Sequence, residues 1–147
     1  MSGKVAVVKV GAGSDIELKE KADRVEDAIC ATKAAIKEGI VPGGGIALLN
    51  AAMYIQGLTQ GEWVLLDAIK APYHTILSNA GIEIPMPQEE GTGLNVITGE
   101  TVNMIKAGII DPLLVTKSAL KNASSVATTI LSTDCVINNL RINEGNR

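Results

Sequence analysis

A run of three glycines, Gly43 to Gly45, most constrains how this chain can fold. It follows a long charged segment that ends at Gly39, and it directly precedes an aliphatic segment. Glycine loses more conformational freedom on folding than any other residue, so three in a row predict that another group approaches the backbone closely. The first turn of a helix has unpaired N–H groups and partial positive charge, which suit a polar or anionic ligand. A turn that only caps the second helix is the competing interpretation, and it is the commoner use of such glycines.

The segment before this turn has the pattern of one long helix. Ser14 followed by Glu17 is a capping-box pattern, which predicts a helix start near Asp15, and Gly39 predicts its end after Glu38. Apolar side chains at helical spacing predict a buried stripe at Val25, Ile29, Thr32 and Ile36. Favourable pairs four residues apart are expected on the solvated side, at Glu17–Lys21 and Glu20–Arg24.

Asp27 is a carboxylate in the middle of this helix. Asp23 lies one turn earlier as a like-charge neighbour, and only Arg24 is placed to offset the two. A solvated helix carboxylate is the plain interpretation. The alternative is a catalytic carboxylate directed at a nucleotide that is bound near the glycine turn.

Further helices are expected over residues 46–55, 62–79 with a break at Pro72, and 111–132. Asp111 is expected to be the N-cap of the last helix, with Pro112 at its first position. That helix has a face of small residues that favours close packing, namely Ala119, Ala123, Val126 or Ala127, and Ile130.

Three short β-structures complete the predicted fold. Lys4–Val10 is a β-branched apolar run and predicts a buried strand. Residues 94–102 predict a small hairpin that turns at Gly99, and Cys135–Ile137 predicts a final strand. The fold class is therefore mainly α, with an N-terminal strand, a small hairpin and a C-terminal strand.

Composition excludes several classes of function. Sixteen acidic and thirteen basic residues among 147 give a net charge of -3, which argues against a nucleic-acid surface. No apolar run is long enough to span a membrane. Cys30 and Cys135 lack metal or redox spacing, so free thiols in a reducing compartment, the cytoplasm, are expected. His74 is the lone histidine and predicts no metal site.

Three stretches resemble, in order, the group I chaperonins (the GroEL family). They are KVAVVKVGAGSDIELKEK from residue 4, RVEDAICATKAAIKEGIVPGGGIALL from residue 24, and GLNVITGETVNMIKAGIIDPLLVTKSALKNASSVATTILSTDC from residue 93. The resemblance covers nearly the whole chain and is weakest over residues 53–92. It implies that residues 1–39 are an intermediate-domain segment and that residues 40–147 are the C-terminal half of an equatorial ATP-binding domain.

The resemblance also implies roles for particular residues. Asp27 matches the catalytic aspartate that orients the attacking water, and it reaches the nucleotide only when the intermediate domain swings down. The residues that match nucleotide contacts are Gly43 and Gly44 on the ribose side, Asp111 at the ribose hydroxyls, and Asn95, Val96, Ile97 and Ile109 around the adenine. The family usually has small alanines where Val96 and Ile97 stand, so the base pocket is expected to be tighter or partly blocked.

The implied function is ATP-dependent protein folding, by ATP-driven encapsulation of non-native chains. The cofactors would be ATP and Mg²⁺, held mainly by a phosphate loop and carboxylates that belong to the family's N-terminal half and do not occur in this sequence. We therefore expect no efficient ATP hydrolysis by the isolated chain. No metal ligand is assigned within it.

The implied partners are other chaperonin subunits or the N-terminal half, and we expect a homo-oligomer. Unfolded proteins and a co-chaperonin would bind only through the apical domain, which this sequence lacks; nucleic acid and membranes are not expected. The alternative function is a non-catalytic helical module for interaction or oligomerisation, derived from a chaperonin.

Overall fold

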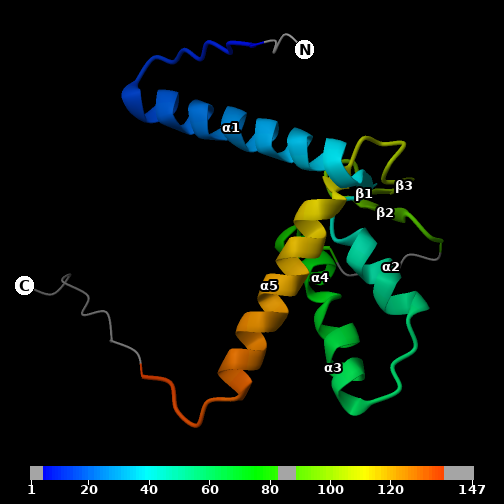
Figure 1. The fold of residues 1–147 in the computed structure, drawn as a ribbon. Helices are drawn as coiled ribbons and strands as arrows, with labels where there is room; N and C mark the ends of the chain where they lie inside the picture. Colours follow the sequence, from blue (N-terminus) through cyan, green and yellow to red (C-terminus); the bar gives the residue numbers. More distant parts are fainter. Residues whose placement is uncertain (1–4, 83–88, 138–147) are drawn as a thin grey trace, which may run out of the picture.

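The computed structural model describes residues 5–82 and 89–137 (Figure 1). Within these ranges the chain is mainly helical, as predicted, and its strands form two small antiparallel sheets. The helices are α1 (Asp15–Glu38), α2 (Ile46–Tyr54), α3 (Gln60–Ala68), α4 (Ala71–Asn79) and α5 (Leu113–Leu131). The strands are β1 (Ile40–Pro42), β2 (Thr92–Asn95), β3 (Glu100–Asn103) and β4 (Ile110–Pro112).

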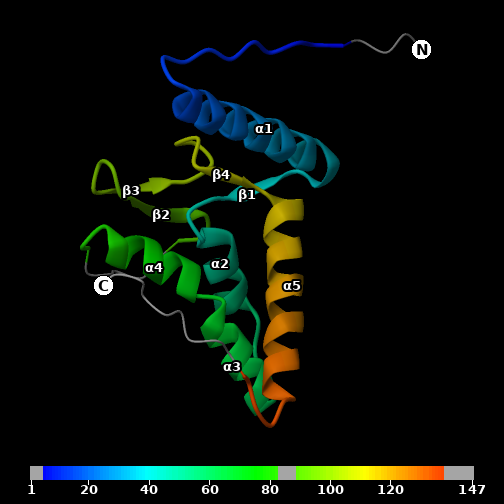
Figure 2. The same ribbon diagram turned by 90° about the vertical axis from the view of Figure 1, so that its left-hand side faces the viewer.

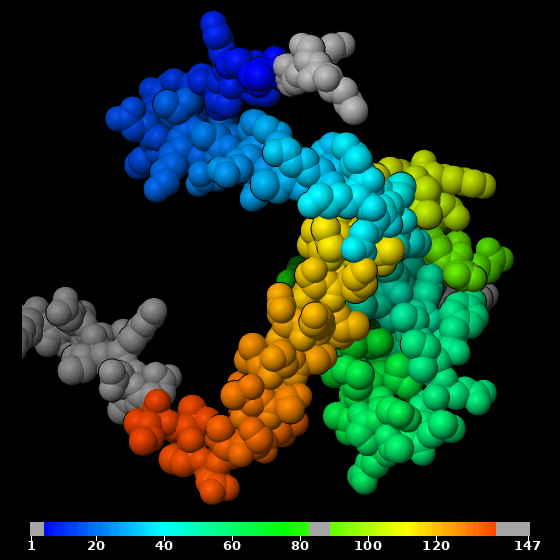
Figure 3. Space-filling view, viewed as in Figure 1, coloured from blue at the N-terminus to red at the C-terminus, as the bar shows by residue number. Residues whose placement is uncertain are grey.

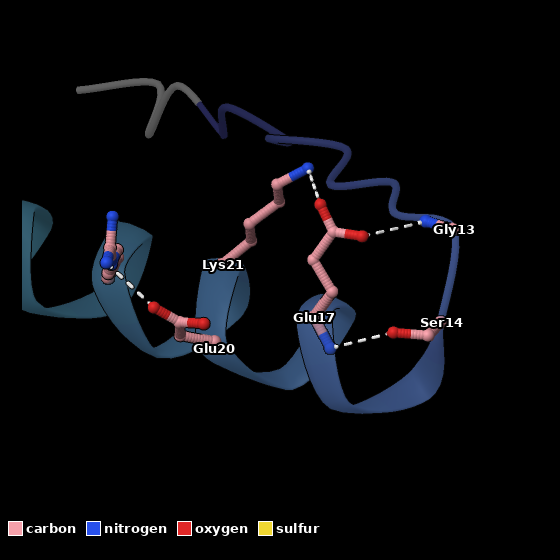
Figure 4. A network of polar contacts seen from close by, with 6 residues as sticks. Gly13, Ser14, Glu17, Glu20 and Lys21 are labelled. Carbon is pink, nitrogen blue, oxygen red and sulfur yellow. Dashed lines mark hydrogen bonds and ion pairs between the residues drawn. The ribbon is translucent and has the colours of Figure 1, made fainter.

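Helix α1 begins and ends where the sequence predicts. The Ser14 side chain accepts a hydrogen bond from the Glu17 N–H at 3.3 Å, and Gly39 ends the helix with a φ of 86°. The Glu17 carboxylate accepts from the N–H of Gly13 at 3.2 Å and pairs with Lys21 at 2.8 Å (Figure 4). The carboxylate thus caps the backbone one residue before the position that a capping box uses. The predicted Glu20–Arg24 pair is also present, at 2.7 Å.

The predicted buried stripe of α1 is wrong. Ile36 is 80% exposed and Ile29 is 41% exposed, and only Ala34 of this helix is buried. Helix α1 meets the rest of the chain at its C-terminal end, where it contacts α5 and β4 (Figures 1 and 2). The stripe is therefore exposed over most of the helix, because the contacts of α1 with α5 and β4 lie at its C-terminal end.

The core is small and lies where α2, α4 and the residues after β3 meet. Its buried members are Ile46, Leu49, Tyr73, Leu77 and Met104, with Leu94, Val102 and Ile109 packed against them. Helix α4 starts with Pro72 in its first turn, so the predicted break between two helices is confirmed. The β2–β3 hairpin closes over this core and is also confirmed.

The sequence did not predict the pairing of β1 with β4. These strands are antiparallel, with Ile40 opposite Pro112 and Pro42 opposite Ile110. Each strand has three residues and ends in proline, which cannot donate to a β-ladder, so neither has the usual signature of a strand. The pair brings the end of α1 next to the start of α5, where the N–H of Leu113 donates to the Gly39 carbonyl at 3.1 Å.

The two predicted terminal strands are wrong over the residues that the structure describes. Residues 5–10 form no strand, with Val5 90% exposed and Val7 79% exposed, and residues 135–137 form none either. Lys4 lies outside the described residues. A strand requires a neighbour to satisfy its backbone N–H and C=O groups, and the described chain provides none beside these segments.

The chain exposes much more surface than a compact domain. Its accessible surface is 12025 Å², whereas a compact protein of 15.3 kDa exposes about 7,100 Å². The excess is still about 2,400 Å² if residues 1–4, 83–88 and 138–147 are given the full exposure of an extended chain. Figure 3 shows the open side of α5 and the separation of α1 from the lower helices. None of the described helices is long and apolar enough to cross a membrane.

Candidate functional site

The β1–β4 pair brings together three of the predicted nucleotide-binding residues. The N–H of Gly43, directly after β1, donates to the carbonyl of Ile109 at 3.0 Å. In the same register Val41 lies opposite Asp111. Gly43, Ile109 and Asp111 therefore lie at one junction, although more than 60 residues separate Gly43 from the other two in the sequence. We call this group of residues, together with Gly44, the β1–β4 junction.

At each glycine of the triplet, another segment of the chain lies too close to leave room for a Cβ atom. A Cβ on Gly43 would lie 3.1 Å from the carbonyl carbon of Ile109. Gly44 has a φ of 66°, and its Cβ would lie 2.9 Å from the methyl group of Met104. Gly45 has a φ of 79°, and its Cβ would lie 2.7 Å from the backbone nitrogen of Tyr73. The close approach that the glycines predict is thus made by neighbouring segments, which agrees with the structural interpretation.

Gly44 is the more accessible of the two glycines that the family resemblance assigns to the nucleotide. Gly43 is buried, whereas Gly44 is half-buried. Gly45 is the N-cap residue of α2 and adopts the left-handed conformation, so the turn also caps that helix. Because Gly43 donates its N–H within the chain, the free backbone surface offered to a ligand is mainly that of Gly44.

Asp111 is not the helix N-cap that the sequence predicts. The N-cap of α5 is Pro112, no side chain caps the helix, and Asp111 lies in β4. The reason is that Gly39 supplies the carbonyl that accepts from the Leu113 N–H, so backbone replaces a capping side chain. Within the described chain the half-buried Asp111 carboxylate makes no ion pair or hydrogen bond, and burial raises its pKa. A partly desolvated carboxylate of this kind is able to accept hydrogen bonds from a ligand.

The β2–β3 turn holds the three residues that the resemblance assigns to the adenine side. The Asn95 side-chain oxygen accepts from the Ile97 N–H at 3.0 Å, and the Asn95 carbonyl accepts from Gly99 at 2.8 Å. Val96 is 41% exposed and Ile97 is 91% exposed. No hydrogen bond in the described ranges joins this turn to the β1–β4 junction. Leu94 and Ile109 nevertheless pack on the same core, so the base of the hairpin and the junction share one support.

Asp27 lies away from the junction. It is exposed on α1, about 16 Å along the helix axis from Glu38, given a rise of 1.5 Å per residue. Asp27 and Ala34 are seven residues apart and therefore lie on the same face of α1, and Ala34 is the buried residue of that helix. The carboxylate thus lies two turns beyond the contact with the rest of the chain, on the side that faces it.

The described residues provide no metal site and no phosphate cradle. No group of three or more His, Cys, Asp or Glu side chains gathers within residues 5–82 and 89–137. The cavity of about 280 Å³ between α3–α4 and α5 lies elsewhere and is almost wholly apolar. It contains none of the predicted site residues. The junction therefore offers one carboxylate, a glycine backbone and an aliphatic side chain, and within the described ranges that carboxylate belongs to no cluster of three metal-ligating side chains.

One long-range ion pair was also not predicted from the sequence. The Lys117 ammonium on α5 bonds the Glu38 carboxylate at the last residue of α1. Both residues look like ordinary solvated charges in the sequence, because 79 positions separate them. Only the unpredicted β1–β4 pair brings these two helix ends together.

The arrangement of helices and small sheets is that of a segment of a chaperonin. Its fold matches the crystal structure of a group III chaperonin in the open state, with a TM-score of 0.73 and 28% sequence identity over 87% of this chain. The chain spans 30% of the length of that structure's chain. The sequence model of the TCP-1/cpn60 chaperonin family matches residues 1–141, and the chain belongs to this family.

Proposed function

We propose that this chain is part of an ATP-dependent chaperonin of the group I type, acting in the cytoplasm. Residues 1–39 act as an intermediate-domain segment, and residues 40–147 act as the C-terminal half of the equatorial domain. The chain supplies one side of the nucleotide site and contacts with other subunits of a ring. The complete assembly folds non-native proteins by ATP-driven encapsulation. Family membership supports the chaperonin role, and the resemblance to the GroEL family supports the finer assignment.

One observation carries the proposal: the β1–β4 pair joins Gly43, Ile109 and Asp111, which come from distant parts of the sequence. Asp111 is half-buried without a partner among the described residues, so its carboxylate is free to accept from the hydroxyls of a ribose. Ile109 offers aliphatic surface to a base, and Gly44 offers backbone without a side chain. These residues fit the nucleoside part of ATP. The triphosphate and Mg²⁺ require donors and carboxylates from outside this chain.

Asp27 has the proposed role of orienting the water that attacks the γ-phosphate. Phosphoryl transfer to water requires an in-line nucleophile, and a carboxylate is able to position it. Asp27 shares a face with Ala34, so a rotation of α1 toward the rest of the chain would bring the carboxylate closer to the junction. Gly39, with a φ of 86° and a ψ of -169°, is the connection about which α1 would turn.

The exposed apolar surface favours a second candidate, a non-catalytic module for oligomerisation. Leu58 is 89% exposed, Trp63 is 60% exposed and Leu131 is 85% exposed. Apolar patches larger than a few hundred Å² usually mark interaction surfaces. A nucleotide-binding subunit that is only part of a domain would have the same surfaces, so nucleotide binding is what separates the two candidates.

The test is made in a complete chaperonin that carries this segment, with a fluorescent ATP analogue. Asp111→Ala should weaken binding about 10- to 100-fold, since a hydrogen bond to a charged group is worth about 1.5–3 kcal/mol. Asp67→Ala, at an exposed carboxylate on α3, is the matched control and should leave binding unchanged. Equal affinities for the two variants would refute the role of Asp111. A ring that assembles without binding nucleotide would favour the second candidate.

The isolated chain provides a second test of the same proposal. It should not turn over ATP at the rate of an intact chaperonin, because it lacks the residues for phosphate and Mg²⁺. Phosphate release should be measured after contaminating host chaperonin has been removed. Efficient turnover by the pure chain would contradict the proposed division of the site.

A further inference from the structure

The residues proposed to hold the nucleoside of ATP come from two different small sheets. Gly44 and Asp111 belong to the β1–β4 junction, whereas Asn95 lies at the end of β2 in the hairpin. The two sheets lie next to each other between α1 and α2 (Figures 1 and 2). In the described chain no strand of one sheet pairs with a strand of the other. A site shared by both sheets therefore requires another residue to set their separation.

The side chain of Met104 is packed between the hairpin and the glycine turn. Met104 follows β3 directly, is 2% exposed and belongs to the buried core. A Cβ added to Gly93 of β2 would lie 3.1 Å from its sulfur. A Cβ added to Gly44 would lie 2.9 Å from its terminal methyl group. The side chain thus lies against the hairpin at its sulfur and against the glycine turn at its methyl group.

The backbone of Met104 joins the same two regions. Its N–H donates to the Gly91 carbonyl at 3.0 Å, just before β2, and its carbonyl accepts from the Ile109 N–H at 2.8 Å. The Ile109 carbonyl in turn accepts from the Gly43 N–H at 3.0 Å. A series of backbone hydrogen bonds therefore runs from the base of the hairpin through Met104 to the glycine turn.

We propose that Met104 is a positioning residue of the nucleoside site. It sets the distance between the adenine side, on the hairpin, and the ribose side, at the β1–β4 junction, and it does not touch the ligand. This inference rests on the proposed nucleotide-binding function. A ligand gains fully from contacts on both sides only when they are held at the right separation beforehand, because a fixed geometry removes the cost of ordering them.

The shape of the methionine side chain suits this spacing role. Methionine is unbranched and flexible, and it fills irregular gaps in a core. Its sulfur lies near Gly93, and its methyl group, one atom further along, lies near Gly44. Leucine has a similar volume but ends one atom earlier, so it would fill the core without reaching both glycines. Met104→Leu therefore separates the burial of this side chain from its effect on spacing.

The first test uses a complete chaperonin that carries this segment. Calorimetric titrations with ATP and with ribose 5-triphosphate, which lacks the base, give two affinities, and their ratio measures what the adenine side adds. Met104→Leu should lower this ratio about tenfold, because a loosened geometry forfeits the gain from holding both sides at once.

Leu77→Met is the matched control for this exchange. Leu77 is 1% exposed in the same core, and none of its atoms lies within 4 Å of a Cβ on Gly44. It should leave the ratio of affinities unchanged. The urea midpoints of both variants should stay close to that of the parent, as conservative core exchanges usually do.

Amide hydrogen exchange provides a second readout that needs no nucleotide. It is measured on the 147-residue chain and corrected for any change in global stability. The Gly43 N–H, which ends the series of hydrogen bonds, should exchange at least about fivefold faster in Met104→Leu than in Leu77→Met, because local packing sets the frequency of local opening.

Failure of the Met104 role and failure of the nucleotide site give different results. The role of Met104 is refuted if Asp111→Ala weakens ATP binding while Met104→Leu leaves both the ratio and the Gly43 exchange at parent values. An equal fall of the ratio in Leu77→Met would show a general effect of the core and would also refute it. An unchanged ATP affinity in Asp111→Ala would instead overturn the proposed site, and with it the role of Met104.

Discussion

The β1–β4 junction and helix α5 differ in how tightly the rest of this chain packs against them. At the junction the packing is so close that a Cβ added to Gly43 would lie 3.1 Å from the carbonyl carbon of Ile109. The adjoining core residues Ile46 and Leu49 are fully buried. On α5 no residue is buried, and Leu131 is 85% exposed. The same chain is therefore densely packed at one end of α5 and only loosely packed along the rest of the helix.

This difference shows which contacts the chain encodes by itself. The junction is built from backbone hydrogen bonds and close glycine contacts between segments of this chain. The apolar residues Val115, Val126 and Ile130 of α5 are exposed in the described chain, which is expected of a chain that spans 30% of a similar chaperonin structure. Mutations should therefore affect folding strongly near the junction and affect association along α5.

The largest expected effect is the loss of a core side chain. Leu49→Ala removes a fully buried side chain and should lower the free energy of unfolding by about 2–5 kcal/mol. Leu131→Ala, at the exposed end of α5, should change it by less than about 0.5 kcal/mol. Urea unfolding followed by circular dichroism, at a dilution where the chain is monomeric, measures both. Equal losses for the two variants would mean that α5 is covered within the monomer.

The next effect tests the steric role of the glycine turn. Gly45→Ala forces a Cβ to within 2.7 Å of the Tyr73 nitrogen at a φ of 79°, and should cost about 2–3 kcal/mol of stability. Gly61→Ala is the matched control, because Gly61 lies in α3 and nothing lies within 4 Å of its added Cβ. The control should stabilise by up to about 1 kcal/mol. Unfolding curves in which both variants match the parent would contradict the packing of the turn.

A smaller effect concerns the pH dependence of stability at Asp111. Burial raises the pKa of this carboxyl above its ordinary value, so the folded chain holds the proton more tightly than the unfolded chain. The resulting stability is fully present below the unfolded pKa and is lost as pH rises through the raised folded pKa. Asp111→Asn should therefore be more stable than the parent at about pH 7 and equal to it in acid, below the ordinary aspartate pKa. A variant that is less stable at neutral pH would show that the carboxylate has a stabilising partner.

Local signals predicted most of the helices. Ser14 and Gly39 mark the ends of α1 correctly, and Pro72 marks the start of α4, because capping and backbone restrictions act over a few residues. Gly99 likewise marks the hairpin turn. The residues that set the boundaries of these elements lie within a few positions of each boundary.

Long-range pairing accounts for the errors. The β1–β4 pair joins two three-residue segments that each contain proline, so no local sequence pattern predicts it. Without that pair, Asp111 looks like a helix cap, whereas it is a partly buried strand residue. Residues 5–10 have the composition of a strand but no neighbour among the described residues, since composition predicts a tendency and pairing requires a partner.

The candidate site was predictable only through the family resemblance. The residues alone favoured a solvated Asp27 and a structural glycine turn, and the local geometry agrees with both interpretations in the isolated chain. The resemblance assigned seven residues to one nucleotide site, and the fold brings three of them, Gly43, Ile109 and Asp111, together at the β1–β4 junction. The proposed binding of a nucleotide by these residues would depend on a completed pocket, and we expect half of that pocket to belong to another part of the protein.

The most direct test is ATP binding and hydrolysis measured on one preparation of a complete chaperonin that carries Asp27→Ala in this segment. We predict unchanged affinity for ATP and hydrolysis slowed by about a hundredfold or more, the effect expected from losing a catalytic carboxylate. Asp23→Ala, one turn earlier on α1, should change neither quantity. Loss of ATP binding in Asp27→Ala, or hydrolysis at the parent rate, would contradict the proposed role of this chain in the nucleotide site.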